Sequence, residues 1–532
     1  MRRRLVLCAV LVAGIGMSHA LDYRGLETVP VQENGRKKPF LVFADESLLS
    51  LTGRTSVVKD GQKLGSVEAI AGMWLLPAGW EATPLVLVNN RDLKAAIGLD
   101  EGQKLFTYSA LAANEALRAL LAEVSAVRLR NPKAKLDPVK KAGADVGMRL
   151  AVFEGLVSGR AVSLLPTGAA AWSALADDDP ALGKLQAAVR TDDQAAFDSA
   201  VGALVAEQAA QNPRFQADNG KIGLETFYQR LHPFRWAWIL YLCAGLCLLA
   251  IQGRAAGFGY AAAWVLALGG FVMQVTGFYC RVAVSGRAPV TNMYESVVWV
   301  AFGTILFALI FEAIHRCRYF LLGAVPVAVV SLILADTQPV ILGRSIHPLV
   351  PVLADNFWLT THVLTITLSY AAFALALGVS HIVLGKVIVG SRPSAALYNY
   401  LYRALQVGVL LLATGTVLGG VWANYSWGRF WDWDPKETWA LIALLGYLFL
   451  LHGRIAGKWG GFGLAVGSVV AFQSIIMAWY GVNFVLGVGL HSYGFGTGGF
   501  PMAVAFVLLE LAFMLTAVVR HRSRTPGPAV AA

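Results

Sequence analysis

Long apolar segments recur from Phe234 to near the end of the chain, and short polar loops separate them. A helix needs roughly 20 apolar residues to cross a bilayer, so we predict a membrane all-α fold, a polytopic bundle of about nine transmembrane helices. Segments 320–335 and 438–452 are short for a span, and 357–385 is long enough to project beyond the bilayer. The predicted segments are 234–252, 258–278, 296–314, 320–335, 357–385, 405–422, 438–452, 462–480 and 500–519.

The residues before Phe234 follow a different pattern. Through about residue 108, short β-like runs such as FLVF and PLVLVNN are broken by Gly and Pro. From about 109 to 211, alanine-rich stretches carry charges at helical spacing, as in ALAANEALRALLAEVSAV. We therefore predict an α+β or mostly helical domain over 21–232, a membrane domain over 233–522 and a tail over 523–532.

The first 20 residues, MRRRLVLCAVLVAGIGMSHA, have the layout of a secretory signal peptide, with three arginines, an apolar run and a small-residue exit. Cleavage is expected after Ala20, and a retained signal anchor is the alternative. In both cases we expect residues 21–232 to be exported.

Composition and charge agree with this layout. The chain is 56% hydrophobic and 14% charged, which is typical of a protein exposed to lipid. Its net charge of +11 does not indicate a nucleic-acid partner, because the basic residues follow the membrane topology and favour the predicted inner loops. We expect a bacterial inner (cytoplasmic) membrane. With 21–232 outside, the inner loops hold Arg254, Arg316, Arg318, Lys386, Arg392, Arg403, Arg454, Lys458, Arg520, Arg522 and Arg524, and the outer loops hold Arg281, Arg287, Arg344, Arg429 and Lys436.

One predicted outer loop, residues 422–439, reads WANYSWGRFWDWDPKETW and holds five of the fifteen tryptophans. Tryptophan anchors at a membrane interface are one interpretation. Anchors do not account for Asp432, Asp434 and Glu437 in the same loop, and aromatic planes with polar groups between them also suit a flat stacked ligand or a sugar.

Two histidines lie on the same predicted side as this loop. His362 is near the outer end of the fifth segment, and His491 follows the eighth. Two imidazoles brought face to face could ligate the iron of a heme lying on the loop. His347 is also outside and competes for a ligand role, whereas His452 lies at the inner end of the seventh segment.

The stretch WGRFWDWDPKETW resembles the WWD signature of the CcsA/ResC family, the heme-handling proteins of System II cytochrome c biogenesis. GRAPVTNMYES, residues 286–296, is similar to another segment of that family. The family has a histidine on each side of the WWD loop, matching His362 and His491, and another in the following helix, matching His452. The resemblance covers roughly 225–520, while 21–232 resembles the periplasmic part of fused CcsBA members only loosely.

This resemblance implies that the chain carries heme b to the outer face, holds it with His362 and His491, and presents it for thioether attachment to the CxxCH motif of apocytochrome c. It would then be a subunit of a holocytochrome c synthase of the heme lyase type. His452 would be a transmembrane heme ligand, with a ResB-like membrane subunit and a thiol-reducing protein as partners. The implied heme platform is Trp427, Trp431, Trp433, Asp432, Asp434 and Glu437, with propionate contacts from Arg281, Arg287, Arg429 or Lys436.

Two rival functions fit the same residues. A membrane glycosyltransferase or ligase would use the tryptophans to stack sugars and the carboxylates for acid–base or metal chemistry. A heme transporter without ligation activity is the other.

The topology can be tested by cysteine labelling. Cysteines introduced at Ser426 and Ser492 should react with an impermeant reagent from outside, and one at Gly457 should not, because the basic residues place Gly457 inside. Labelling of Gly457 alone would reverse the topology and remove the basis for an outer heme site.

Overall fold

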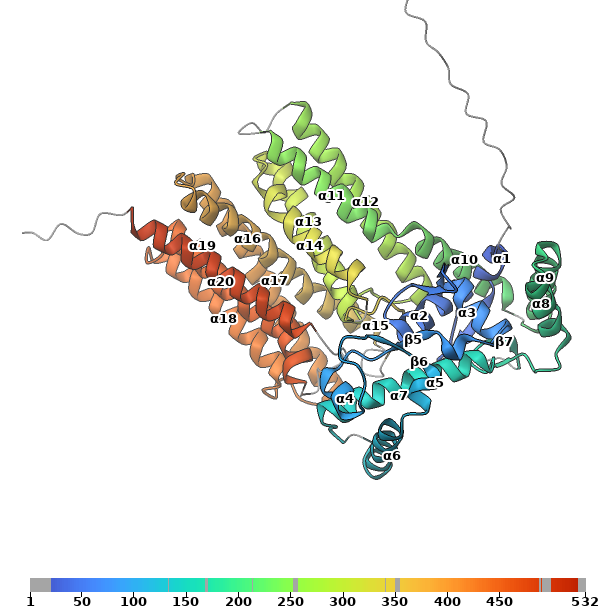
Figure 1. Cartoon of the computed structure of the whole chain (residues 1–532). Coiled ribbons are helices and arrows are strands. Elements are labelled where there is room, and N and C mark those ends of the chain that lie inside the picture. Colours follow the sequence, from blue (N-terminus) through green and yellow to red (C-terminus); the bar gives the residue numbers. More distant parts are fainter. Residues whose placement is uncertain are drawn as a thin grey trace, which may run out of the picture. The chain divides into compact units, whose positions relative to one another are not determined.

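A computed structural model describes residues 21–524, apart from 133, 168–170, 213, 252–256, 340, 350–354, 488 and 490–498. The predicted signal peptide and His491 therefore lie outside the described residues. The chain divides into two compact units between Ile222 and Gly223 (Figure 1).

The first unit combines helices with short antiparallel strands. The hairpins β1–β2 and β7–β8 join into one sheet of order β2-β1-β7-β8, in which Gln32 of β1 pairs with Ser163 of β7. Separate hairpins are formed by β3–β4 and β5–β6. The elements are α1 Arg24–Glu27, β1 Pro30–Glu33, β2 Arg36–Pro39, α2 Phe40–Thr52, β3 Ser56–Lys59, β4 Gln62–Gly65, α3 Ser66–Leu75, β5 Pro84–Leu87, α4 Arg91–Ala96, β6 Leu105–Thr107, α5 Tyr108–Ala112, α6 Glu115–Arg130, α7 Pro138–Val157, β7 Ser163–Pro166, β8 Trp172–Ala174, α8 Pro180–Thr191 and α9 Gln194–Gln211.

This unit contains the strands and helices that the sequence predicts, but one local interpretation is wrong. The run FLVF begins α2 and is not a strand. Burial at Phe40, Phe43, Ser47 and Leu51 repeats at helical spacing, so the apolar run belongs to a helix face that packs into the core. PLVLVNN does begin with a strand, β5.

In the second unit, nine helices among the described residues are long and apolar enough to cross a membrane. This confirms the predicted polytopic all-α membrane fold. The fourth and seventh spans are not short, since they extend to 19 and 21 residues. The helices are α10 Phe215–Leu231, which continues into α11 Pro233–Ala250, then α12 Phe258–Ser285, α13 Met293–His315, α14 Tyr319–Thr337, α15 Asn356–Trp358, α16 Leu364–Ile388, α17 Ala395–Trp427, α18 Pro435–Ile455, α19 Gly461–Ile476 and α20 Phe500–Arg522.

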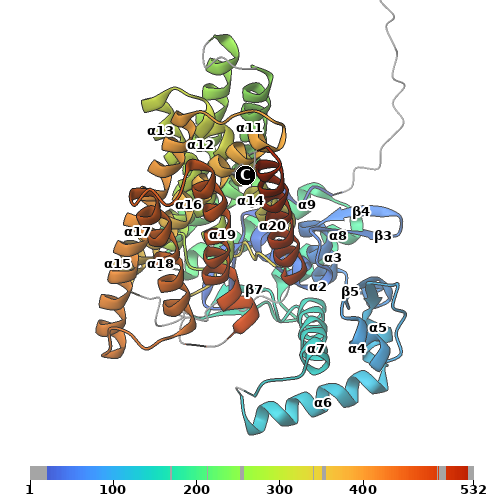
Figure 2. The same ribbon diagram turned by 90° about the vertical axis from the view of Figure 1, so that its left-hand side faces the viewer.

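Helix α16 is the central element of this unit. It contacts α13 and α14 on one side and α17, α19 and α20 on the other, and the two views of the chain show it between these groups (Figures 1 and 2). In the span that it forms with the preceding π-helical turn, 72% of an apolar 18-residue stretch is buried, a larger share than in the other spans among the described residues. Because the helices on its two sides meet largely through it, α16 sets their relative positions.

A glycine contact lets α16 approach α14 closely. Gly378 of α16 packs against the backbone of Gly323 in α14, and a Cβ atom at Gly378 would overlap the Gly323 carbonyl group. Helices in a membrane associate through close packing, and small residues permit it. The neighbouring backbone cannot move aside as a side chain can.

We therefore expect Gly378→Ala to lower the apparent midpoint of thermal unfolding in detergent by several degrees, because overpacking costs about 1–3 kcal/mol. Gly385→Ala on the same helix is the matched control, since a Cβ there meets nothing within 4 Å. Equal midpoints for the two variants would contradict the close contact.

Candidate ligand-binding cavity

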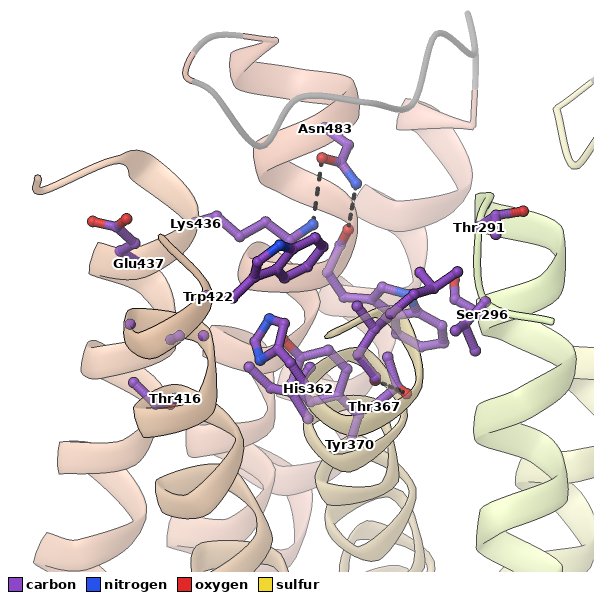
Figure 3. A pocket seen from close by; sticks show the side chains of 18 of the residues that line it. Thr291, Ser296, His362, Thr367, Tyr370, Thr416, Trp422, Lys436, Glu437 and Asn483 are labelled. Carbon is purple, nitrogen blue, oxygen red and sulfur yellow. Dashed lines mark hydrogen bonds between the residues drawn. The ribbon is translucent and has the colours of Figure 1, made fainter. Parts of the chain in front are cut away.

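A cavity of about 180 Å³ lies where several segments of the second unit converge (Figure 3). One wall is the loop 290–292 with the start of α13, and α17 and the start of α18 form the opposite side. The rest of the lining comes from two π-helical segments, Leu359–Val363 (η3) and Met477–Leu486 (η4), from the start of α16 and from residues 430–431 of the loop before α18. The lining residues are Val290, Thr291, Asn292, Met293, Ser296, Leu359, His362, Val363, Ile366, Thr367, Tyr370, Thr416, Gly419, Gly420, Trp422, Phe430, Trp431, Lys436, Glu437, Ala440, Trp479 and Asn483.

His362 lies in the cavity wall with a defined orientation. Its Nδ1 is 2.8 Å from the carbonyl oxygen of Gly415. A carbonyl only accepts, so Nδ1 carries the proton and Nε2 carries the lone pair. The imidazole also meets the ring of Trp422 edge to face, with centroids 5.7 Å apart. This is the tautomer and the restraint that a metal-ligating histidine needs.

Helix α17 can approach His362 because its facing positions are glycines. A Cβ at Gly415 would lie 2.9 Å from the backbone of Ile366, and one at Gly419 would lie 2.6 Å from Cε1 of His362. Gly415 and Gly419 are four residues apart and so share one helix face. The imidazole therefore lies directly against the α17 backbone.

Aromatic rings line the cavity, but only one belongs to the predicted platform trio. Trp431 lines it together with Trp422 and Trp479. Trp433 is 69% exposed, has the left-handed φ of +57° that is uncommon for an aromatic residue, and stands perpendicular to Trp431 with centroids 5.9 Å apart. Trp427 is not among the lining residues. The three rings do not form a single flat surface.

The loop carboxylates stabilise the turn into α18. Asp434 is the N-cap and accepts from the backbone N–H of Lys436 at 2.9 Å, and Glu437 completes a capping box. Glu437 also accepts from the backbone N–H of Asp432 at 2.9 Å, and Asp432 pairs with Arg429. In Figure 3 the Glu437 carboxylate points away from His362. These carboxylates hold the loop in shape.

The four predicted propionate contacts have different surroundings. Arg281 is 1% exposed and paired with Glu295, and Arg287 donates to the carbonyl of His347. Arg429 lies over the Trp427 ring, at 5.7 Å from its centroid. Of the four, only Lys436 lines the cavity, and its Nζ donates to Oδ1 of Asn483 at 3.4 Å.

The other histidines occupy separate places. His452 lies near the far end of α18 from the cavity, with Nδ1 2.8 Å from the carbonyl of Leu448. His347 is exposed and does not line the cavity. His491 lies outside the described residues, but Gly489, two residues earlier, packs against the Asp434 carboxylate and Pro435 at the start of α18. Gly489 thus lies beside the end of the tryptophan loop.

A buried carboxylate in the last span has a partner on the central helix. Glu510 of α20 lies 3.1 Å from Nε2 of His381 in α16. His381 lies seven residues before the end of α16, where its ring stacks on Phe513. The pair balances an ionisable group that is costly to bury in lipid.

Several lining residues were not identified from the sequence. Trp479, Asn483 and Tyr370 lie within apolar spans, where they read as ordinary packing residues. The Gly415–Gly419 spacing just before the tryptophan loop is a signal that could have indicated a close helix contact at this point. Thr291 and Asn292 lie in GRAPVTNMYES, which the family resemblance had singled out.

These features define a polytopic membrane protein with an aromatic-lined cavity that presents a histidine at one end of its helix bundle. The sequence profile of the cytochrome c assembly protein family matches residues 290–491, a range that includes every lining residue of the cavity. The chain belongs to the CcsA family of cytochrome c biogenesis proteins and has a role in that process.

Individual relatives agree with this assignment. Cytochrome c biogenesis protein CcsA of Prochlorococcus marinus is 38% identical over 247 residues, which are 40% of this chain and 78% of that protein. CcsA of Guillardia theta is 34% identical over 239 residues, again 40% of this chain and 78% of the relative. Protein NrfI of Wolinella succinogenes is 28% identical over 507 residues, covering 88% of this chain, which spans 54% of NrfI.

The capping role of Asp434 can be separated from a role for its charge. Asp434→Ala should speed hydrogen exchange of the 432–438 amides by about fivefold, because a lost N-cap costs about 1 kcal/mol. Asp434→Asn should leave exchange nearly unchanged, since asparagine also caps. If both variants exchange equally fast, the negative charge itself is required and the capping interpretation fails.

Proposed function

We propose that this chain binds heme b in the cavity at the outer end of its helix bundle and presents it for covalent attachment to apocytochrome c. The observation that carries the proposal is the geometry of His362. Its Nδ1–H donates to the Gly415 carbonyl, which leaves the lone pair on Nε2. The imidazole ring is part of the cavity wall. A histidine held in this tautomer is suited to bind heme iron through Nε2.

The remaining walls fit a porphyrin. Trp422, Trp431 and Trp479 offer aromatic surface to a flat macrocycle. At about 180 Å³ the cavity is smaller than the roughly 300–1,000 Å³ of pockets that enclose a drug-sized ligand. A heme would therefore enter the cavity only in part and leave the rest outside, which is what presentation to another protein requires.

Charge at the cavity favours an anionic group. Lys436 is a positively charged residue in the cavity lining, and its ammonium group donates to Oδ1 of Asn483. We assign it as the propionate contact. Arg281 is committed to Glu295 inside the protein, so we do not assign it to a propionate.

His491 is the proposed second axial ligand. Gly489 brings the chain to Asp434 and Pro435, at the N-terminus of the helix that also carries Lys436. Gly489, two residues before His491, therefore lies beside the start of the helix whose Lys436 and Glu437 line the cavity. His452, near the other end of α18, is the proposed ligand for heme on its way through the membrane, with a ResB-like subunit supplying its counterpart.

The attachment itself joins reduced cysteines of a CxxCH motif to the vinyl groups of heme, each thiol adding across one vinyl double bond. A thiol-reducing protein would keep those cysteines available. The residues of this chain orient the heme and restrict water on one face, and we propose the chain as a subunit of a heme lyase in the bacterial inner membrane.

The glycosyltransferase alternative has less support. It needs carboxylates available for acid–base chemistry, whereas Asp434 and Glu437 cap α18 and Asp432 pairs with Arg429. A transporter without ligation activity would use the same cavity. Covalent heme on a co-expressed CxxCH protein distinguishes it from a lyase.

The purified protein should show a Soret band, with the α and β bands of bis-histidine heme on reduction. His362→Ala and His491→Ala should each lower the heme content severalfold or leave the heme oxidised, because each removes one axial ligand. Added imidazole should restore the spectrum by occupying the vacated position. Visible spectroscopy and heme content per protein measure both effects.

His347→Ala is the matched control, since His347 is on the predicted outer side but does not line the cavity. Heme loss in this variant, with retention in His362→Ala, would overturn the ligand assignment. A purified protein with no Soret band would overturn the heme proposal as a whole.

A further inference from the structure

One carboxylate beneath the cavity wall joins two parts of the second unit. Glu295, in the first turn of α13, is 3% exposed. Its Oε2 accepts from the backbone N–H of Thr291 at 2.8 Å and from the Thr291 hydroxyl at 2.7 Å. Its Oε1 accepts from Nε and Nη2 of Arg281 at 3.1 and 2.6 Å. Every described contact of this side chain leads either to the cavity loop or to Arg281.

Arg281 extends the connection to two further segments. From α12 it donates through Nη1 to the carbonyl of Arg344 at 2.9 Å and to the Tyr228 hydroxyl at 3.3 Å. The guanidinium also lies over the Tyr294 ring, 5.2 Å from its centroid. With these contacts its position is determined from several sides, and the Glu295 carboxylate is fixed with it.

The loop held in this way is part of the cavity. Thr291 and Asn292 both line it, and Asn292 caps α13 by accepting from the backbone N–H of Glu295 at 2.8 Å. In Figure 3, Thr291 and Ser296 lie across the cavity from Glu437. The nearby wall is tied to η4, since Nε1 of Trp479 donates to Oγ of Ser296 at 2.9 Å.

We infer that Arg281 and Glu295 are positioning residues, and that this buried ion pair fixes the 290–292 wall of the cavity so that the ligand is held in one orientation. The inference rests on the proposed function in so far as the ligand is heme. Neither side chain is among the residues that line the cavity, so both act through Thr291 and Asn292.

The chemistry of burial supports a role in positioning more than in stability. Two charges removed from water are not efficient stabilisers, and well-packed apolar residues often replace such a pair without loss. What apolar residues cannot supply is a set of directional acceptors for the Thr291 N–H and hydroxyl. Fixing a loop beside a cavity requires those acceptors.

Two double variants separate these effects. Arg281→Met with Glu295→Met removes both charges and the acceptors, and avoids leaving a single buried charge that could prevent folding. Arg281→Met with Glu295→Gln removes the charges but keeps an amide oxygen for Thr291. The control is Asp336→Ala, which breaks the Arg235–Asp336 pair. This pair joins α11 and α14 at 2.9 and 3.0 Å, and neither of its residues lines the cavity.

The first readout is independent of heme. A cysteine at Ala288, which is 9% exposed and packs with Val290 and Leu359, reports loop opening through its maleimide labelling rate in a background lacking the natural cysteines. The Met/Met variant should label about tenfold faster or more, because the loop loses charge-assisted hydrogen bonds. The Met/Gln variant should recover most of the original rate, and Asp336→Ala should keep it.

The second readout is the visible spectrum. The Met/Met variant should contain a larger fraction of high-spin heme, and in the Met/Gln variant this fraction should return toward that of the unmodified protein. Unchanged labelling in Met/Met would overturn the inference, as would faster labelling with an unchanged spectrum. Absence of heme from the unmodified protein would overturn the proposed function instead, while the labelling rates would still decide whether the pair positions the loop.

Discussion

Close backbone contact between α16 and its neighbours is the constraint on which the second unit depends. On one side Gly378 lies against Gly323 of α14, and on the other Gly415 of α17 lies against Ile366. Side chains at these positions would push the helices apart. Because the helices on the two sides of α16 meet largely through it, these contacts also determine where the ends of α13, α17 and α18 lie, and hence the shape of the cavity between them.

The cavity is formed by departures from regular helix. Two π-helical segments carry His362 and Trp479 into it, and such segments occur often at functional sites because the wider turn redirects side chains. The tryptophan loop is held by a capping box, and the opposite wall by a buried carboxylate. Polar residues around the cavity thus serve two purposes. A few line the cavity, and the rest form hydrogen bonds with backbone groups where the chain departs from regular helix.

The family match and the cavity involve the same part of the chain. The profile match begins at Val290, in the wall supported by Glu295, and ends at position 491, so it contains the cavity and excludes the first unit. The similarity to NrfI covers 88% of the chain and therefore extends into that unit. The role in cytochrome c biogenesis rests on the shared membrane part, and the heme chemistry proposed here rests on the cavity.

The sequence by itself determined the membrane fold, the number of spans and the family, because apolar length and a short motif are local properties that need no knowledge of neighbours. It also indicated His362, the tryptophan loop and Lys436. It could not show that Asp434 and Glu437 cap a helix, that Trp433 is exposed outside the cavity lining, or that Arg281 is paired with Glu295. The run FLVF has the pattern of a strand in the sequence but begins a helix in the structure. These outcomes depend on contacts between residues far apart in the chain: whether a charge faces a ligand or another side chain is decided by packing. Only the tertiary structure could bring Thr291, His362, Trp431 and Trp479 around one cavity.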